Sequence, residues 1–305
     1  MSAGRVLITG AAGFVGSALA TGFLASRWQV AAVDRAFDAS ARTRLSGADR
    51  IRADLGADPA PALPSADVII HAAALTTDPA EAGITCADHL GANLAPLLAI
   101  LRHAARSAPS AFVFLSSSGV FEPGDGDPDL TDACTPTART PYAAAKRAGE
   151  LLAPAALAGV CDVHVVRLGH LYGPHEMPRA SRMGLSRVAR YRADAAAGRP
   201  LIPAAGDPRR EWTHVDDLAP ALTRLLAGPP RAGAVHLCAP AVLRDSELAA
   251  IVAAAVPGTR IAPAPESGPP AKPPMIASRL AALDGLAWTA PRDGIAALCR
   301  QKVPA

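Results

Sequence analysis

Short, continuously apolar runs alternate with alanine-rich stretches along the first two thirds of the chain. Because these runs do not alternate apolar with polar residues, each is predicted to be a strand that is covered on both faces, as in a parallel sheet. Strand and helix repeated in this order predict a doubly wound α/β sheet. The predicted strands are 5–9, 29–33, 68–71, 111–115 and 163–168. Three helices are predicted: one after the first glycine-rich turn that ends at about residue 26, one near 86–107, and one over 142–158.

The composition fits a core of small aliphatic side chains. Half of the 305 residues are hydrophobic but only 4% are aromatic, so Ala, Val, Leu and Ile must fill the interior. The net charge of +3 leaves room for an anionic substrate, while the lack of a Lys/Arg block interleaved with aromatic residues argues against nucleic acid. Five scattered cysteines without a CxxC pair indicate neither a disulfide framework nor a metal site.

No targeting or membrane segment is expected. The first strand begins at Arg5, without a basic segment followed by an apolar stretch and a cleavage site. No run of about 18 uncharged apolar residues occurs in the sequence. The protein is therefore expected to be cytoplasmic and to bind no membrane.

The pattern changes after Pro174. Residues 175–200 carry six arginines, which form either a solvated helix face or a positive rim that steers an anionic substrate. Residues 257–274 hold seven prolines in eighteen positions, which forbids a regular helix there. The expected division is a sheet domain over 1–173, rejoined by 213–240, and a smaller, discontinuous lobe over 174–212 and 241–305.

A glycine-rich turn, TGAAGFVG, follows the first predicted strand. Its three glycines supply a tight turn, a close backbone approach and free N–H groups at a helix start, which a bound pyrophosphate needs. The strand before it and the helix after it support a dinucleotide site. The expected cofactor contacts in this turn are Gly10, Gly13, Phe14, Val15 and Gly16.

An acid ends the second predicted strand. Asp34 is placed to accept hydrogen bonds from the adenosine ribose hydroxyls and to repel a 2′-phosphate, which favours NAD. Arg35 follows directly and is able to bind such a phosphate, so NADP remains the alternative. Asp54 and Leu55 are expected at the adenine edge, although Asp54 is equally well interpreted as a loop or cap aspartate.

Small residues end and follow the predicted strand 68–71, in the segment HAAA. Ala72 and Ala73 are expected to let a dinucleotide lie close to the backbone. His71 is interpreted as an interior histidine that satisfies its own hydrogen bonds.

Tyr142 and Lys146 form a Y-x-x-x-K pair in TPYAAAKRAGE. Four residues apart on a helix, both side chains leave the same face. Pro141 suits the first helical position and Thr140 the cap. An ammonium beside a phenol lowers the pKa of the phenol, so Tyr142 is expected to serve as a base near neutral pH.

Together these residues resemble the extended short-chain dehydrogenase/reductase family, of the NAD-dependent epimerase/dehydratase type. The resemblance covers nearly the whole chain and implies a Rossmann-type parallel sheet with a smaller C-terminal substrate-binding lobe. It also implies a homodimer formed by the helix after Tyr142 and the helix near 86–107. The motifs that carry it are TGAAGFVG, Asp34, HAAA, Asn93 in GANLAPLLAIL, the serine run before Val120-Phe121, Y-x-x-x-K, Arg167 with Tyr172-Gly173-Pro174, and REWTHVDDLA.

The resemblance also implies the catalytic roles. Tyr142 would remove a hydroxyl proton while a hydride leaves the same carbon for the nicotinamide, and Ser117 would hydrogen-bond the reacting oxygen. Lys146 would hold the nicotinamide ribose. Asn93 matches the family's helix-4 asparagine and is expected near the cofactor, with a purely structural role as the alternative.

Three positions bear on the reaction and the substrate. Dehydratase members resemble one another in an Asp-Glu pair after the catalytic Ser/Thr, where this chain has Ser118 and Gly119, so dehydration is disfavoured. Arg210 matches the arginine that contacts the nucleotide diphosphate, although it would hold a sugar carboxylate equally well. His170 replaces an asparagine that usually contacts the sugar nucleotide. The expected substrate contacts are Ser117, Ser118, His170 and Arg210.

The leading hypothesis is an NAD-dependent enzyme that oxidises a secondary hydroxyl of a carbohydrate-like, anionic substrate, most simply a nucleotide-sugar epimerase. The alternative is a dehydrogenase of a sugar acid or small hydroxy compound that releases NADH. A dinucleotide-sensing regulator is disfavoured, because such proteins tend to lose the catalytic tyrosine or lysine and this chain keeps both.

Overall fold

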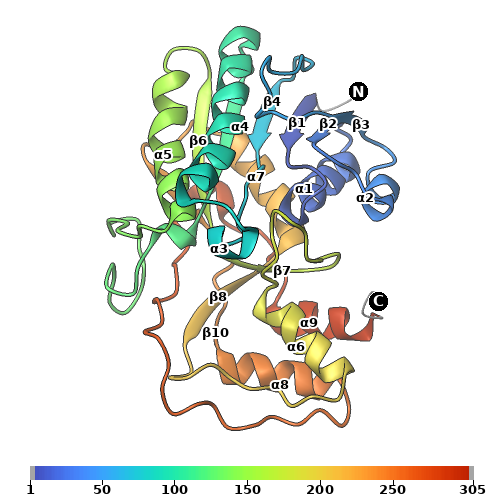
Figure 1. The fold of residues 1–305 in the computed structure, drawn as a ribbon, viewed down its shortest axis with the longest axis vertical. Helices are drawn as coiled ribbons and strands as arrows, with labels where there is room; N and C mark the ends of the chain where they lie inside the picture. Colours follow the sequence, from blue (N-terminus) through green and yellow to red (C-terminus); the bar gives the residue numbers. More distant parts are fainter. Residues whose placement is uncertain (1–3, 302–305) are drawn as a thin grey trace.

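A seven-stranded sheet with the strand order β3-β2-β1-β4-β5-β6-β9 forms the centre of the larger lobe (Figure 1). The computed structural model describes residues 4–301; residues 1–3 and 302–305, the ends of the two expected lobes, lie outside the described residues. All six strand pairs are parallel, and the order reverses between β1 and β4. The strands are β1 (Arg5–Thr9), β2 (Gln29–Asp34), β3 (Asp49–Arg52), β4 (Val68–His71), β5 (Ala111–Ser117), β6 (Asp162–Leu168) and β9 (Ala234–Leu237).

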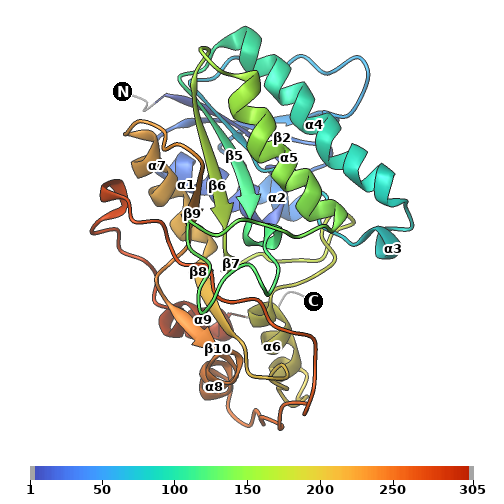
Figure 2. The same cartoon turned by 90° about the vertical axis from the view of Figure 1, so that its left-hand side faces the viewer.

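Helices cover both faces of this sheet (Figure 2). On one face, α1 (Phe14–Ala25) packs beside α7 (Leu218–Leu226), and on the other α4 (Cys86–Ser107) packs beside α5 (Pro141–Ala156). The predicted doubly wound, Rossmann-type α/β fold with a smaller second lobe is confirmed.

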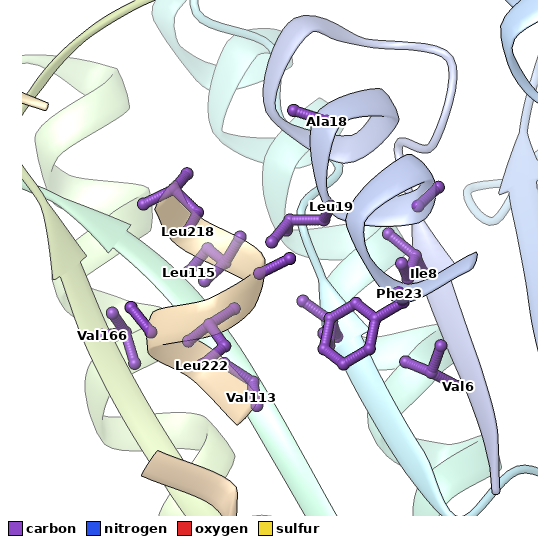
Figure 3. Packing of buried hydrophobic residues seen from close by; sticks show 14 of the residues in the cluster. Val6, Ile8, Ala18, Leu19, Phe23, Val113, Leu115, Val166, Leu218 and Leu222 are labelled. Atoms are coloured by element: carbon purple, nitrogen blue, oxygen red, sulfur yellow. The ribbon is translucent and has the colours of Figure 1, made fainter. Parts of the chain in front are cut away.

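The alternation of side chains along β1 separates two cores. Val6 and Ile8 belong to the cluster beneath α1 and α7, where Phe23 and Leu222 are also buried (Figure 3). Leu7 points to the opposite face and joins the cluster beneath α4. The three consecutive apolar residues of β1 are therefore buried on both sides of the sheet, as the sequence predicted.

The helix starts follow local sequence signals. Thr140 accepts a hydrogen bond from the Ala143 N–H at 3.2 Å and Pro141 occupies the first turn, which confirms the cap predicted for α5. Thr85 and Asp88 form a reciprocal capping box at the start of α4.

A three-stranded sheet with the order β10-β8-β7 organises the smaller lobe. Its core contains Tyr172, Trp212 and Leu248, all buried. The strands are β7 (His170–Tyr172), β8 (Arg209–His214) and β10 (Val242–Arg244), and the helices are α6 (Arg187–Ala196), α8 (Asp245–Ala255) and α9 (Pro291–Arg300). The short elements elsewhere are α2 (Ala39–Arg44), α3 (Pro79–Ala82), η1 (Ser118–Val120), η2 (Val215–Asp217) and η3 (Ala281–Leu283).

The chain passes between the lobes several times. α7 and β9 return to the large sheet, while β7 pairs with β8 and so lies in the small sheet, just before the expected boundary at 173. The division into 1–173 with 213–240 and 174–212 with 241–305 remains a prediction. Residues 257–274 contain no helix, as their prolines predicted. Among residues 4–301, no helix has the length and apolar character needed to cross a membrane.

Candidate active site

A cavity of about 930 Å³ runs along the carboxyl ends of the parallel strands and continues against the smaller lobe. This is the edge at which open α/β sheets bind their ligands. Nearly all the residues expected from the sequence line it: Gly10, Gly13, Phe14, Val15, Gly16, Asp34, Arg35, Asp54, Leu55, Ala72, Ala73, Ser117, Ser118, Tyr142, Lys146, His170 and Arg210.

The glycine-rich turn is packed too closely for larger residues. Gly10 has φ +66°, and a Cβ there would lie 2.7 Å from the backbone of Ala73. A Cβ at Gly16 would lie 2.1 Å from the carbonyl oxygen of Gly10. Helix α1 follows with Gly13 as its cap and no side-chain capping bond, so its first N–H groups are left to an anion. This turn fits the pyrophosphate of a dinucleotide.

Asp34 lies beside this turn at the end of β2. Its carboxylate accepts the N–H of Ala12 at 3.0 Å and that of Ala36 at 3.3 Å, which holds the side chain in place. Asp54 lines the same end of the cavity and also accepts the N–H of Gly56 at 2.9 Å. Asp54 therefore caps its own loop, as one of the two interpretations expected, while remaining exposed to the cavity.

Asn93 is the expected cofactor residue that does not line the cavity. Its side-chain oxygen accepts the N–H of Leu75 at 2.9 Å, and its amide nitrogen donates to the carbonyls of Leu75 (3.1 Å) and His89 (3.0 Å). These three bonds use the amide to connect α4 to the loop after β4. The expected cofactor contact of Asn93 is therefore corrected to the structural alternative.

His71 is an interior histidine, as interpreted from the sequence. It is 1% exposed and its Nδ1 lies 2.8 Å from the Thr9 hydroxyl. Burial, followed by the charge of Lys146, lowers the pKa of His71 to about 3. The ring therefore stays neutral at physiological pH.

Ser117, Tyr142 and Lys146 meet where β5 ends and α5 begins. The Ser117 hydroxyl accepts the N–H of Gly119 at 3.0 Å, and its closeness to the Tyr142 phenol acts to lower the pKa of that phenol. A Cβ at Gly119 would lie 3.3 Å from Cε1 of Tyr142, so the phenol ring covers this turn. The Nζ of Lys146 donates to the carbonyl of Leu115 at 2.7 Å and lies 5.8 Å from the centre of the Tyr142 ring.

The electrostatics of this group differ from the expectation. Burial lowers the pKa of Lys146 to about 8, although Glu150 opposes the shift. The prediction that the pKa of Tyr142 is lowered is wrong: burial raises it, and outweighs the Ser117 hydrogen bond and the charge of Arg182 that act the other way. The ammonium is bound to a backbone carbonyl of β5, not to the phenol.

Arginines dominate the other end of the cavity. Arg182 pairs with Glu176 at 2.6 Å and Arg187 with Asp245 at 3.5 Å. Arg190 and Arg210 line the cavity without a carboxylate in ion-pair distance in the described part of the chain. With Arg179 also in the lining, four of the six arginines in 175–200 face the cavity, which favours the positive rim over the solvated face.

His170 is braced by the smaller lobe. Its Nδ1 lies 3.2 Å from Oε1 of Glu211, a carboxylate that is 1% exposed. Burial alone would raise the pKa of Glu211, but His170 and the N–H of Met275 together lower it. His170 also lies against Trp212, with ring centres 5.6 Å apart. His170 is thus oriented at the cavity wall.

Lys272 is a cavity residue that the sequence did not reveal. It comes from the proline-rich segment, and its Nζ donates to the carbonyl of Ser118 at 2.6 Å. Burial lowers its pKa. A signal was present in the composition, because lysine occurs in this chain only at Lys146, Lys272 and Lys302, the last of which lies outside the described residues. Within residues 4–301, no group of His, Cys, Asp and Glu side chains suits a metal ion.

Comparisons with known proteins agree with this geometry. The model of the NAD dependent epimerase/dehydratase family matches residues 6–236. The dTDP-glucose 4,6-dehydratase of Streptomyces niveus is 31% identical over 267 residues, covering 80% of this chain and 75% of that protein.

Solved structures show the same architecture over nearly the whole chain. MoeE5 in complex with UDP-glucose and NAD is 25% identical, with a TM-score of 0.76 and 97% of both chains covered. UDP-glucose 4-epimerase from Thermotoga maritima, solved with UDP-glucose, is 18% identical with a TM-score of 0.76 and the same coverage, which shows a common fold.

Proposed function

The chain belongs to the NAD-dependent epimerase/dehydratase family of enzymes, and from this premise we propose that it is a nucleotide-sugar epimerase that inverts a secondary hydroxyl. The observation that carries the proposal is the position of Ser117, Tyr142 and Lys146, which line one cavity between a glycine-rich turn and a cluster of arginines. One end suits a dinucleotide and the other suits a second, anionic ligand.

The cofactor end fits NAD better than NADP. The Asp34 carboxylate is held at the end of β2 by two backbone N–H groups, where it would accept hydrogen bonds from ribose hydroxyls and repel a 2′-phosphate. When bound, NAD would accept a hydride from the sugar carbon and return it to the opposite face of that carbon, which inverts the hydroxyl. Arg35 keeps NADP as the alternative.

The side chains of this protein would handle the proton. Tyr142 would take the proton from the sugar hydroxyl, and Ser117, which lines the same cavity, would hydrogen-bond the same oxygen. Lys146, whose Nζ donates to the Leu115 carbonyl, would hold the nicotinamide ribose. Burial raises the pKa of Tyr142 overall, and the positive charge of Arg182 acts in the opposite direction, toward the phenolate needed for this step.

Dehydration is disfavoured by the side chains at the cavity wall, although the curated relative is a dehydratase. Eliminating water requires an acid and a base next to the sugar. Among the described residues, the carboxylates that line the cavity are Asp34 and Asp54, both at the cofactor end, and Ser118 and Gly119 occupy the positions of the Asp-Glu pair.

A dehydrogenase with net NADH release is the second candidate, because the free guanidinium of Arg210 would hold the carboxylate of a sugar acid as well as a diphosphate. Proton NMR of the protein with NAD and a panel of nucleotide sugars and free sugar acids separates the two. A sugar that changes while NAD stays oxidised supports the epimerase. NADH that grows in step with substrate loss contradicts it and establishes the dehydrogenase.

Assembly and location are also proposals. Leu151 on α5 is 76% exposed and Leu98 on the adjoining α4 is 38% exposed, which supports a homodimer formed through these two helices. Light scattering after size-exclusion chromatography tests it: Leu151→Glu should yield monomers, and a monomeric unmodified protein would contradict it. We retain the cytoplasmic location as a prediction from the sequence.

A further inference from the structure

Lys272 reaches the cavity from an extended segment that runs outside the smaller lobe and back to the large sheet. This segment, residues 263–276, is called the strap (Figure 1). Its end is anchored on both sides: the N–H of Leu130 donates to the carbonyl of Pro274 at 2.9 Å, and the N–H of Met275 donates to Glu211 at 3.0 Å. Lys272 lies two residues before the first of these bonds, so they restrain its backbone while its side chain reaches Ser118 in η1.

The ammonium of Lys272 has an incomplete set of partners. Its hydrogen bond to the carbonyl of Ser118, at 2.6 Å, uses one of three donors. No carboxylate of the described residues lies within ion-pair distance of it. Burial disfavours the charge and lowers the pKa of Lys272. A half-buried ammonium with one neutral acceptor costs free energy that a bound anion would offset.

Lys272 is near Arg210, whose charge helps to lower its pKa, but the hydrogen bond of Lys272 is to the turn that carries Ser117. Ser118, whose carbonyl it contacts, is the neighbour of Ser117, and a Cβ on Gly119 in the same turn would lie 3.3 Å from the Tyr142 ring. Lys272 therefore lies beside the group that would handle the reacting hydroxyl. Arg190 and Arg210, on α6 and β8, already provide two unpaired cations for a diphosphate. Lys272 is a further cation, at the end where the sugar would lie.

We propose that Lys272 binds a carboxylate on the sugar itself, so that the preferred substrate is a nucleotide-linked acidic sugar and not a neutral hexose. This inference rests on the proposed function and names its substrate class. Lys272 is thereby a specificity residue that contacts the substrate, while Ser117, Tyr142 and Lys146 keep their roles.

The test is calorimetric binding of UDP-glucuronate and UDP-glucose to the NAD-loaded protein. Lys272→Met should weaken UDP-glucuronate by about 10-fold or more, the usual effect of losing a hydrogen bond between charged groups. It should leave the affinity for UDP-glucose within about twofold of the unmodified protein, because that sugar has no carboxylate for Lys272 to contact. Lys272→Arg should restore part of the preference for the acidic sugar. The matched control is Arg279→Met, which removes an exposed positive charge that lies outside the cavity lining.

Each other outcome overturns the inference in its own way. An equal loss for both sugars in Lys272→Met would mean that Lys272 only supports the Ser118 turn, and no loss for either would mean that it contacts no substrate. An unmodified protein that binds UDP-glucose as tightly as UDP-glucuronate would also contradict it, while leaving an epimerase intact. If the protein neither binds nor converts any UDP- or dTDP-sugar, the proposed function fails and the inference fails with it.

Discussion

The two ends of the cavity are built by different means. At the cofactor end, Gly10 and Gly16 shape a backbone turn against Ala73, and the N-terminus of α1 supplies N–H groups. At the substrate end, side chains supply the positive charges: Arg190 comes from α6, Arg210 from β8 and Lys272 from the strap. A backbone site is intolerant of added atoms, whereas a site made of separate cations loses affinity one contact at a time. Substitutions at the two ends should therefore differ in kind.

The largest effect is expected at the junction of the two ends. Tyr142→Phe removes the proton acceptor but keeps the ring, so turnover should fall by about 10²–10⁴-fold while NAD affinity stays unchanged. Steady-state kinetics and a fluorescence titration with NADH measure the two quantities separately. A parallel loss of cofactor affinity would mean that the phenol belongs to the cofactor end and that the two ends are not distinct.

The cofactor end should fail abruptly. A Cβ at Gly16 would lie 2.1 Å from a backbone oxygen, so Gly16→Ala must displace the turn and should weaken NAD by about 100-fold, in line with the cost of overpacking. Gly124→Ala is the control, because a Cβ there meets nothing within 4 Å. Similar NAD affinities for the two variants would show that the turn adapts.

The substrate end should weaken in steps. Arg210→Ala removes one charge-assisted contact of about 1.5–3 kcal/mol, so KM for a nucleotide sugar should rise by about 10- to 100-fold with little change in kcat. Arg209→Ala is matched to it, since this neighbour lies outside the cavity lining. If Arg210→Ala lowers kcat and leaves KM unchanged, Arg210 acts on the reaction and not on anchoring.

Asp34 is an exception at the cofactor end, because it is expected to bind the cofactor through its side chain and not through the backbone. Asp34→Ala should weaken NAD binding by about tenfold and reduce the preference for NAD over NADP, because it removes both a hydrogen-bond acceptor and a charge that repels the 2′-phosphate. Competition between the two cofactors measures the ratio. A native protein that already prefers NADP would show that Arg35 outweighs Asp34.

The smallest expected effect concerns stability. With the pKa of His71 at about 3 in the fold and about 6.5 when unfolded, the unfolded chain binds more protons between these values, so stability falls as the pH falls. From about pH 7.5 to about pH 5.5 this group should cost about 1.4 kcal/mol. Urea unfolding at both pH values should show this part of the loss disappear in His71→Asn. An unchanged pH dependence in that variant would mean that other groups cause it.

The local signals in the sequence predicted the larger lobe well. β1 and β4 were evident because a strand in the middle of a parallel sheet carries apolar residues on both faces, as residues 6–8 and 68–70 do. The Thr140 cap and the glycine turn were evident because each acts over a few neighbouring residues. β7 and β10, each of three residues, escaped prediction, since strands this short carry little periodicity.

The site shows the same limit. The pKa of Tyr142 was predicted in the wrong direction because helix spacing places Lys146 near the phenol but says nothing of burial, or of the Leu115 carbonyl that binds the ammonium. The role of Arg187 and Arg190 remained open because an arginine-rich helix has the same sequence pattern whether it faces solvent or a cavity.

The sequence by itself determined the parallel sheet, the dinucleotide turn, the Ser117–Tyr142–Lys146 group and the family, because each depends on residues that are close together in the chain or on motifs in a known order. Only the tertiary structure decided that Lys272 lies against Ser118, 154 residues away, and that the Asn93 amide bonds a loop and does not line the cavity. The physical reason is that burial, ion pairing and pKa depend on what packs around a side chain, and those neighbours come from distant segments.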